Sequence, residues 1–166
     1  MLHLIVELCQ EQFHIPFPMS FLAGYCTTRA SVVWVLADHG EQMVLRYLEK
    51  FYHLARRFSG LKFAPSHVSV LELHYFDVHR RLSEKAEFLQ TILDLHSAIF
   101  GLSAGQVKES AKWRLLAATT VDLITSQTST DVEGDWVKLE AYLRRCYRSI
   151  EQELLKHYTQ TAARTL

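Results

Sequence analysis

The sequence predicts an all-α fold: a single-domain helical bundle of five or six helices, two of them long, over residues 1–166. Three observations lead to this prediction. Glycine and proline are scarce, at 6 and 3 residues, so few positions favour turns over helices. Apolar residues recur at spacings of three and four, the period of an amphipathic helix. Two segments, Ser103–Gln106 and Thr130–Glu133, carry the Ser/Thr-x-x-Glu/Gln pattern that caps helix starts.

The first half of the chain divides into three expected helices. Pro16 and Pro18 disfavour α geometry in the residue before each of them, so residues 13–19 should be extended. Ser20 can cap the helix that follows, although Val32–Val35 is rich in β-branched residues that favour strands. Gly60 is suited to end the third helix. The expected helices of this half cover residues 2–12, 20–37 and 41–58.

The second half carries the clearest periodic signal, an apolar stripe along one helix of about 30 residues. The stripe consists of Leu71, Tyr75, Val78, Leu82, Leu89, Leu93 and Phe100. The capping pattern at Ser103 predicts a fifth helix to about Ser126, and the pattern at Thr130 predicts a long last helix. The residues expected in the core include Leu82, Leu89, Leu143 and Ile150.

Composition argues against several classes of protein. The 18 basic and 18 acidic residues give a formal charge of +0, without the basic excess of an independent nucleic-acid-binding domain. The three cysteines are far apart and form no CxxC pair, which predicts reduced thiols instead of disulfides or a zinc site. Residues 20–37 are apolar, yet Arg29 and Thr27–Thr28 interrupt them, so we expect no membrane span and a cytoplasmic location.

The sequence contains no recognisable motif of a catalytic or cofactor-binding site. Nucleophile elbows, phosphate-binding glycine loops and HExxH are absent, so we expect no enzyme activity and no cofactor. A di-iron bundle needs two Glu-x-x-His motifs, whereas Glu11-x-x-His14 stands alone and runs into Pro16. The other histidines lack partners at metal-binding spacing, so we expect no metal site.

One catalytic alternative stays open. HEPN-type RNases carry Arg-x4–6-His on a bundle helix, where the arginine polarises a phosphate and the histidine moves a proton. Arg46 and His53 have this spacing, and seven residues make two helical turns, so both lie on one face. Tyr47 stands where the motif usually has a polar residue, and the spacing also arises by chance.

Two rows of basic residues lie opposite apolar helix faces. One row lies on the expected third helix and the other on the last helix, each within a narrow sector at helical spacing. Arginine and lysine contact phosphates without reading bases, so such rows could follow a nucleic-acid backbone. The other interpretation is that both rows are solvated helix faces. The candidate nucleic-acid-binding residues are Arg46, Lys50, His53, Arg57, Lys138, Arg145 and Lys156.

In length, helicity and basic rows such as Arg46/Lys50/Arg57 and Lys138/Arg145, the chain resembles the small-subunit family of CRISPR effector complexes. The resemblance covers the whole chain and rests on no diagnostic motif, so it transfers no site residues. It implies a non-catalytic subunit in antiviral defence that packs with other protein subunits, copies of itself included. It also implies sequence-independent contact with an RNA or DNA backbone. The neutral charge is a departure, but neighbouring subunits raise the effective concentration and so assist weak contacts.

A second interpretation is a helical protein–protein adaptor or regulator that binds no nucleic acid. It predicts an exposed apolar patch of roughly several hundred Å². It also predicts that salt bridges divide the basic rows. The nucleoprotein interpretation instead predicts a continuous basic surface and binding that weakens with salt.

Overall fold

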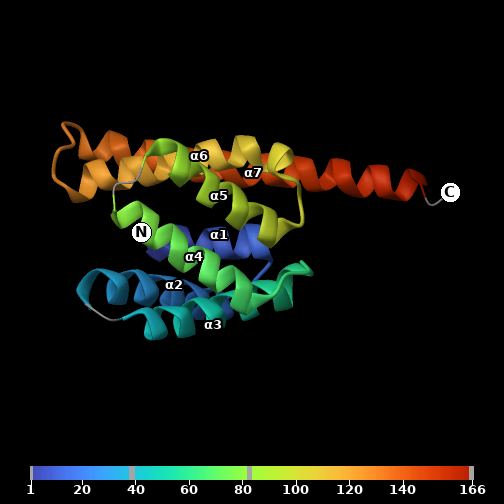
Figure 1. The fold of residues 1–166 in the computed structure, drawn as a ribbon, viewed down its shortest axis with the longest axis horizontal. Helices are drawn as coiled ribbons and strands as arrows, with labels where there is room; N and C mark the ends of the chain where they lie inside the picture. The colour runs from blue at the N-terminus through green and yellow to red at the C-terminus, as the bar shows by residue number, and fades with distance from the viewer. Residues whose placement is uncertain (1, 38–39, 82–83, 165–166) are drawn as a thin grey trace. The chain divides into compact units, whose positions relative to one another are not determined.

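The computed structural model describes residues 2–37, 40–81 and 84–164 of the chain. Within these ranges the protein is built from α-helices without a strand, which confirms the predicted all-α class (Figure 1). The described part contains seven helices, so the predicted number of five or six was too low. They are α1 (Leu2–Phe13), α2 (Met19–Leu36), α3 (Glu41–Ser59), α4 (Pro65–Arg80), α5 (Lys85–Phe100), α6 (Ala104–Thr125) and α7 (Val132–Arg164).

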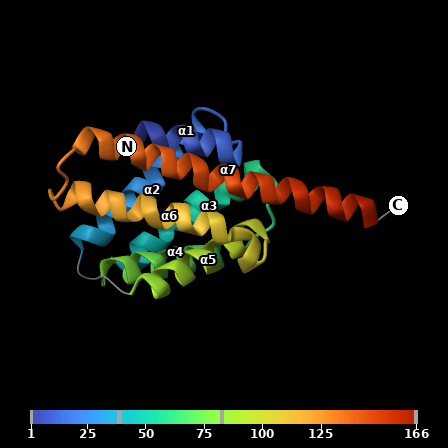
Figure 2. The same cartoon turned by 90° about the horizontal axis from the view of Figure 1, so that it is seen from above.

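The helices belong to two compact units, each of which is described by itself. Unit 1 is Met1–Glu84 and contains α1 to α4, while unit 2 is Lys85–Leu166 and contains α5 to α7. In unit 1, α3 packs against both α2 and α4, and α1 packs mainly on α2. In unit 2, α6 packs against both α5 and α7, and α7 continues past one end of α6 (Figures 1 and 2). The single-domain expectation over residues 1–166 stays a prediction.

The expected single helix over residues 71–100 is instead two helices, α4 and α5, so this part of the prediction is wrong. The buried face of α4 includes Val68 and Tyr75, while that of α5 includes Ile92 and Leu95. On one straight helix, with about 100° per residue, these two faces would point in nearly opposite directions. Two separate helices can bury both faces against the interior, whereas one continuous helix could not.

The predicted core residues are correct only in part. Ile150 is buried on α7, but Leu89 and Leu143 are half-buried, and Leu82 lies outside the described residues. On α5 Phe100 is buried as predicted, but Phe88 and Ile92 are buried in place of the expected Leu89 and Leu93, one position earlier. The buried apolar residues of α5 are Phe88, Ile92, Leu95, Ile99 and Phe100.

The helix boundaries of unit 1 follow local signals in the sequence. Residues 14–18 separate α1 from α2, so the break expected at the two prolines is present. The expected extended conformation of residues 13–19 is wrong, because Phe13 and Met19 are helical, His14 has a φ of 53° and Pro18 has helical angles (φ of −57°, ψ of −28°). α2 stays helical through Val32–Val35, because Val33 packs in the interior and tertiary contacts outweigh a β preference. Gly60 follows α3 in the left-handed conformation, with φ of 73°, which is a common way to end a helix.

The helices α6 and α7 of unit 2 begin at capped residues. The backbone N–H of Ser103 donates to Gln106 Oε1 at 3.0 Å, as the predicted capping box requires. At α7 the expected cap on Thr130 is wrong by one residue. Asp131 is the cap, because its Oδ1 accepts the N–H of Gly134 at 3.0 Å.

The interiors of the two units are formed by buried apolar side chains such as Val44 in unit 1 and Ile92 in unit 2. Within the described residues, none of the helices is both long enough and apolar enough to pass through a bilayer. Cys9, Cys26 and Cys146 are buried free thiols, as the cysteine spacing predicted. Burial raises the pKa of Cys9 and Cys146 to about 12, so both thiols stay protonated and unreactive at neutral pH.

Candidate nucleic-acid interface

The basic row of α3 lies opposite the buried face of that helix. Arg46, Lys50, His53 and Arg57 are all exposed, in agreement with the helical period. Burial of the apolar face fixes the rotation of α3 about its own axis, so the basic row faces solvent. The buried residues of α3 are Val44, Leu48, Phe51, Tyr52 and Ala55.

The basic row of α3 has no acidic partner in the described ranges 2–37, 40–81 and 84–164. Arg46, Lys50 and Arg57 form no ion pair there. Glu49 adjoins the row on the same helix without pairing with it. Arg57 packs instead on the ring of Phe58, with 5.6 Å from the guanidinium carbon to the ring centroid. Because like charges one turn apart repel each other, this row can gain stability from a bound anion.

Part of the row lines a surface hollow between α2 and α3. The hollow has a volume of about 580 Å³ and is lined by Leu22, Cys26, Lys50, His53, Leu54, Arg56 and Arg57. Burial raises the pKa of Cys26, and the Lys50 ammonium opposes this rise. The thiol is therefore neutral at physiological pH, and the charges in the lining are all positive. The hollow is therefore lined by cationic side chains together with the apolar side chains of Leu22 and Leu54.

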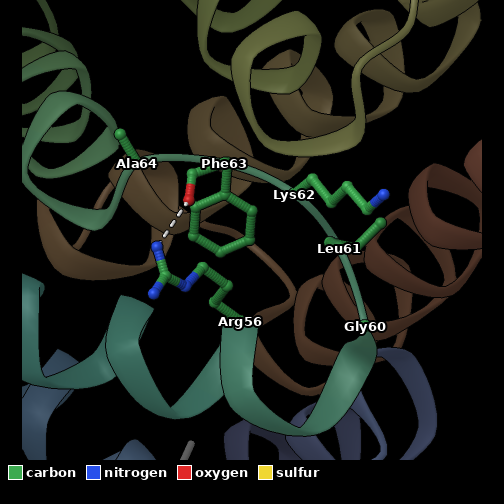
Figure 3. Close-up of a pocket in the computed structure, with 6 residues that line it drawn as sticks. All are labelled: Arg56, Gly60, Leu61, Lys62, Phe63 and Ala64. Carbon is green, nitrogen blue, oxygen red and sulfur yellow. Dashed lines mark hydrogen bonds between the residues drawn. The ribbon is translucent and has the colours of Figure 1, made fainter.

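A second hollow lies beside the first, at the end of α3 (Figure 3). Its volume is about 500 Å³, and its lining consists of Arg56, Gly60, Leu61, Lys62, Phe63 and Ala64. Arg56 reaches from α3 to the loop before α4, where its Nη1 donates to the Phe63 carbonyl oxygen at 3.4 Å. Arg56 lines both hollows, so the positive surface continues from α3 into this loop.

Sequence reasoning missed Arg56 and Lys62 as members of this surface. Arg56 falls outside the narrow sector of the row, and Lys62 lies beyond the helix, so helical spacing could not find either of them. A simpler signal was present in the composition. From Lys50 to Leu71 the sequence contains no acidic residue. A count of charge along the chain, in addition to helical spacing, would have identified both residues.

The basic row of α7 differs from that of α3, because intramolecular partners engage its members. Lys138 Nζ lies 2.8 Å from Asp135 Oδ1, and Lys156 Nζ lies 2.6 Å from Glu153 Oε1. Hydrogen bonds from Lys138 and then Ser129 lower the pKa of Asp135, and the bond to Asp135 raises the pKa of Lys138. Both lysines follow their acids by three residues, so this neutralisation was already visible in the sequence.

The third member of the α7 row, Arg145, packs on an aromatic pair. Its guanidinium carbon lies 4.9 Å from the ring centroid of Trp113 on α6. Trp113 in turn stacks on Tyr142, with centroids 5.7 Å apart. The Arg145 side chain is exposed, but one face of its guanidinium group already packs on the Trp113 ring. The structure therefore leaves α3 as the less compensated of the two basic rows.

The described residues contain no cluster of three or more His, Cys, Asp or Glu side chains that could hold a metal ion. His14 lies beyond the end of α1, with φ of 53°, so the Glu11-x-x-His14 motif does not continue on that helix. Arg46 and His53 share the exposed face of α3, as the HEPN-type spacing requires. Their roles in catalysis stay untested.

No protein-family model matches the chain, and no curated protein or solved structure matches it either.

Proposed function

We propose that this protein is a non-catalytic helical subunit of a nucleoprotein assembly, and that α3 of unit 1 holds a nucleic-acid backbone. The observation that carries the proposal is the row of Arg46, Lys50 and Arg57, which is exposed and has no ion pair among the described residues. The resemblance in length and helicity to small subunits of CRISPR effector complexes supports it, and a cytoplasmic assembly is part of the proposal.

The geometry of the row suits a linear polyanion. Arg46 and Arg57 are eleven residues apart on one helix, which corresponds to about 16 Å. Along the axis of a duplex, one strand carries a phosphate about every 3.4 Å, so this distance corresponds to roughly five phosphate steps. Arg56 and Lys62 extend the positive surface beyond the row. Flexible cations of this kind contact phosphates, so binding should not depend on base sequence.

The neutral total charge fits a subunit that neighbours hold in place. A formal charge of +0 gives the isolated chain little long-range attraction for nucleic acid. Inside an assembly the effective concentration of the nucleic acid is high, so a few phosphate contacts are sufficient. The proposed partners are therefore other protein subunits together with RNA or DNA.

The test is a triple charge reversal, Arg46→Glu, Lys50→Glu and Arg57→Glu. Binding of the full chain to labelled single-stranded and duplex oligonucleotides would be measured by fluorescence anisotropy at several salt concentrations. We expect weak binding that is independent of base sequence. In the variant the slope of log K against log salt should become shallower by about 0.7–0.9 for each phosphate that the protein no longer neutralises.

The matched control is Lys108→Glu, Lys112→Glu and Arg148→Glu. These three residues are exposed in unit 2, so the control changes the total charge equally without touching α3. Circular dichroism would confirm that both variants keep their helices. If the two variants lose affinity equally, total charge matters and the α3 row does not, and the proposal is wrong.

A second candidate function is the protein–protein adaptor without nucleic acid. The ion pairs of Lys138 and Lys156 on α7 favour it, since they divide one of the two rows. An exposed apolar face on α2 favours it as well. Absence of any salt-dependent nucleic-acid binding by the wild-type chain would make this candidate the better one.

A further inference from the structure

One face of α2 is apolar and exposed along most of the helix. A surface helix normally presents polar side chains to water, yet here the large apolar ones are open to solvent. Leu36 is 79% exposed and Val35 is 70% exposed. Contiguous apolar surface of this kind marks interaction sites more often than single exposed residues do. The exposed apolar residues of α2 are Met19, Phe21, Leu22, Tyr25, Val32, Val35 and Leu36.

The α2 face has the spacing of a helix-pairing seam. Phe21, Tyr25, Thr28, Val32 and Val35 follow steps of four, three, four and three, the pattern by which one helix meets another. The seam is about 21 Å long. The opposite side of α2 is buried through small side chains, such as Ala23 and Ala30, so α2 lies close to its neighbours there. Packing inside unit 1 therefore leaves most of the seam exposed, although Tyr25 contacts the Tyr47 ring, with centroids 6.3 Å apart, and Thr28 is half-buried.

A single charged residue, Arg29, stands beside the seam. It is the only charged residue between Met19 and Leu36. Its guanidinium carbon lies 5.9 Å from the ring centroid of Tyr47, and its Nε is buried without a hydrogen-bond partner. Within the described ranges it forms no ion pair. The side chain as a whole is half-buried, so a carboxylate that approached its accessible part would be attracted to this unpaired positive charge.

The neighbouring charges of α3 have the same sign as Arg29. Lys50, Arg56 and Arg57 lie along the hollow that Leu22 and Cys26 of α2 also line. A helix that docks on the α2 face would therefore have cations along its flank. Acidic side chains on that flank would be attracted, and basic side chains would be repelled.

We propose that the α2 face binds an amphipathic helix of a partner protein, with an apolar seam and with a carboxylate placed against Arg29. A second copy of this chain fits less well. If two copies of α2 paired around Thr28, in either direction, each Arg29 would lie beside the other Arg29, and like charges would meet. This inference does not require nucleic-acid binding by α3, but acidic side chains placed against Lys50 and Arg57 would compete with phosphates for the same cations.

The experiment uses the full chain and two designed helical peptides of about 21 residues, three heptads long, with leucine at the seam positions. One peptide carries glutamate at the flanking positions, and the other carries lysine. Fluorescence anisotropy would measure the affinity of each. We expect the glutamate peptide to bind at least about tenfold more tightly at low salt, with a difference that shrinks as salt is added.

Substitutions on α2 locate the binding, with a double variant on α7 as the control. Val35→Gln with Leu36→Gln should abolish binding of the glutamate peptide, while the fold remains, because both side chains are exposed. Val137→Gln with Leu155→Gln is the matched control, since these α7 residues are 66% and 62% exposed. Arg29→Gln should remove most of the preference for glutamate over lysine, and Arg29→Lys should keep part of it.

Three results would overturn the proposal. The first is equal affinity for both peptides, and the second is equal loss of binding in the α2 and α7 variants. The third is a dimer of the chain alone in sedimentation that Val35→Gln with Leu36→Gln dissociates, because the occupant would then be a second copy. The α2 variant should leave oligonucleotide binding unchanged, so failure here is distinguishable from failure of the α3 proposal.

Discussion

The Nδ1 atom of His96 and the Oγ atom of Ser110 lie 2.8 Å apart in the buried interior of unit 2, where they connect α5 to α6. The Ser110 hydroxyl also lies 2.8 Å from the carbonyl oxygen of Val107, to which it can donate its proton. In that arrangement His96 Nδ1 carries a proton and donates it to Ser110, whereas in the other tautomer Ser110 donates to Nδ1. Burial, and then the charge of Arg114, lower the pKa of His96 to about 3. His96 is thus a neutral structural residue at physiological pH.

Acid should destabilise the protein through His96. The folded state keeps this ring neutral down to about pH 3, whereas the unfolded chain protonates it near its ordinary value of 6.5. The unfolded state therefore binds more protons between these two values. The contribution to stability is complete above pH 6.5 and is lost as the pH falls toward 3, by at most about 4–5 kcal/mol.

Chemical denaturation between pH 7 and 4 checks the role of His96. His96→Gln should flatten the dependence of the unfolding free energy on pH. His53→Gln is the matched control, because this histidine is exposed on α3 and contributes nothing to the buried interior of unit 2. Equal slopes in wild type and His96→Gln would show that His96 does not set the acid sensitivity.

The offset core of α5 predicts unequal costs for two neighbouring truncations. Ile92 is 0% exposed, so Ile92→Ala should lower the unfolding free energy by about 2–5 kcal/mol. Leu89 is half-buried, and Leu89→Ala should cost less, roughly 1–2 kcal/mol. Urea denaturation of both variants measures the difference. If Leu89→Ala destabilises the protein more than Ile92→Ala does, the buried face of α5 is the one that the sequence predicted.

The two basic rows should contribute unequally to nucleic-acid binding. Lys138→Glu and Lys156→Glu replace lysines that already have acidic partners, so together they should weaken binding less than Lys50→Glu with Arg57→Glu. Anisotropy at one fixed low salt concentration compares the two double variants, which carry the same change in charge. If the α7 double variant weakens binding more than the α3 double variant, the interface proposed on α3 is wrong.

The purified protein should show no nuclease activity, whether or not metal ions are present. The sequence pattern that suggests activity is Arg46 with His53, and both side chains are exposed on α3. Incubation with labelled RNA, with and without a chelator, tests this expectation. Cleavage that disappears in His53→Ala, with the helical content retained, would establish the RNase alternative instead.

Local chemistry in the sequence was sufficient to predict the all-α class, most helix ends and the exposure of the α3 row. Gly60, Ser103 and the two prolines act on their own backbone or on residues within one turn. The period of α3 likewise places Arg46 and Lys50 opposite Leu48 without knowledge of any other helix. These features depend on geometry within a single helix, which the order of residues specifies directly.

Tertiary structure decided where α4 separates from α5, because an apolar stripe shows that a helix has a buried face without showing what covers it. Ile92 and Val68 belong to different compact units, and only packing within each unit determines the direction that each faces. The same reason applies to Arg56, which lines the two hollows described beside α3, and to the apolar face of α2. Such contacts join residues of different elements, and helical spacing carries no information about them.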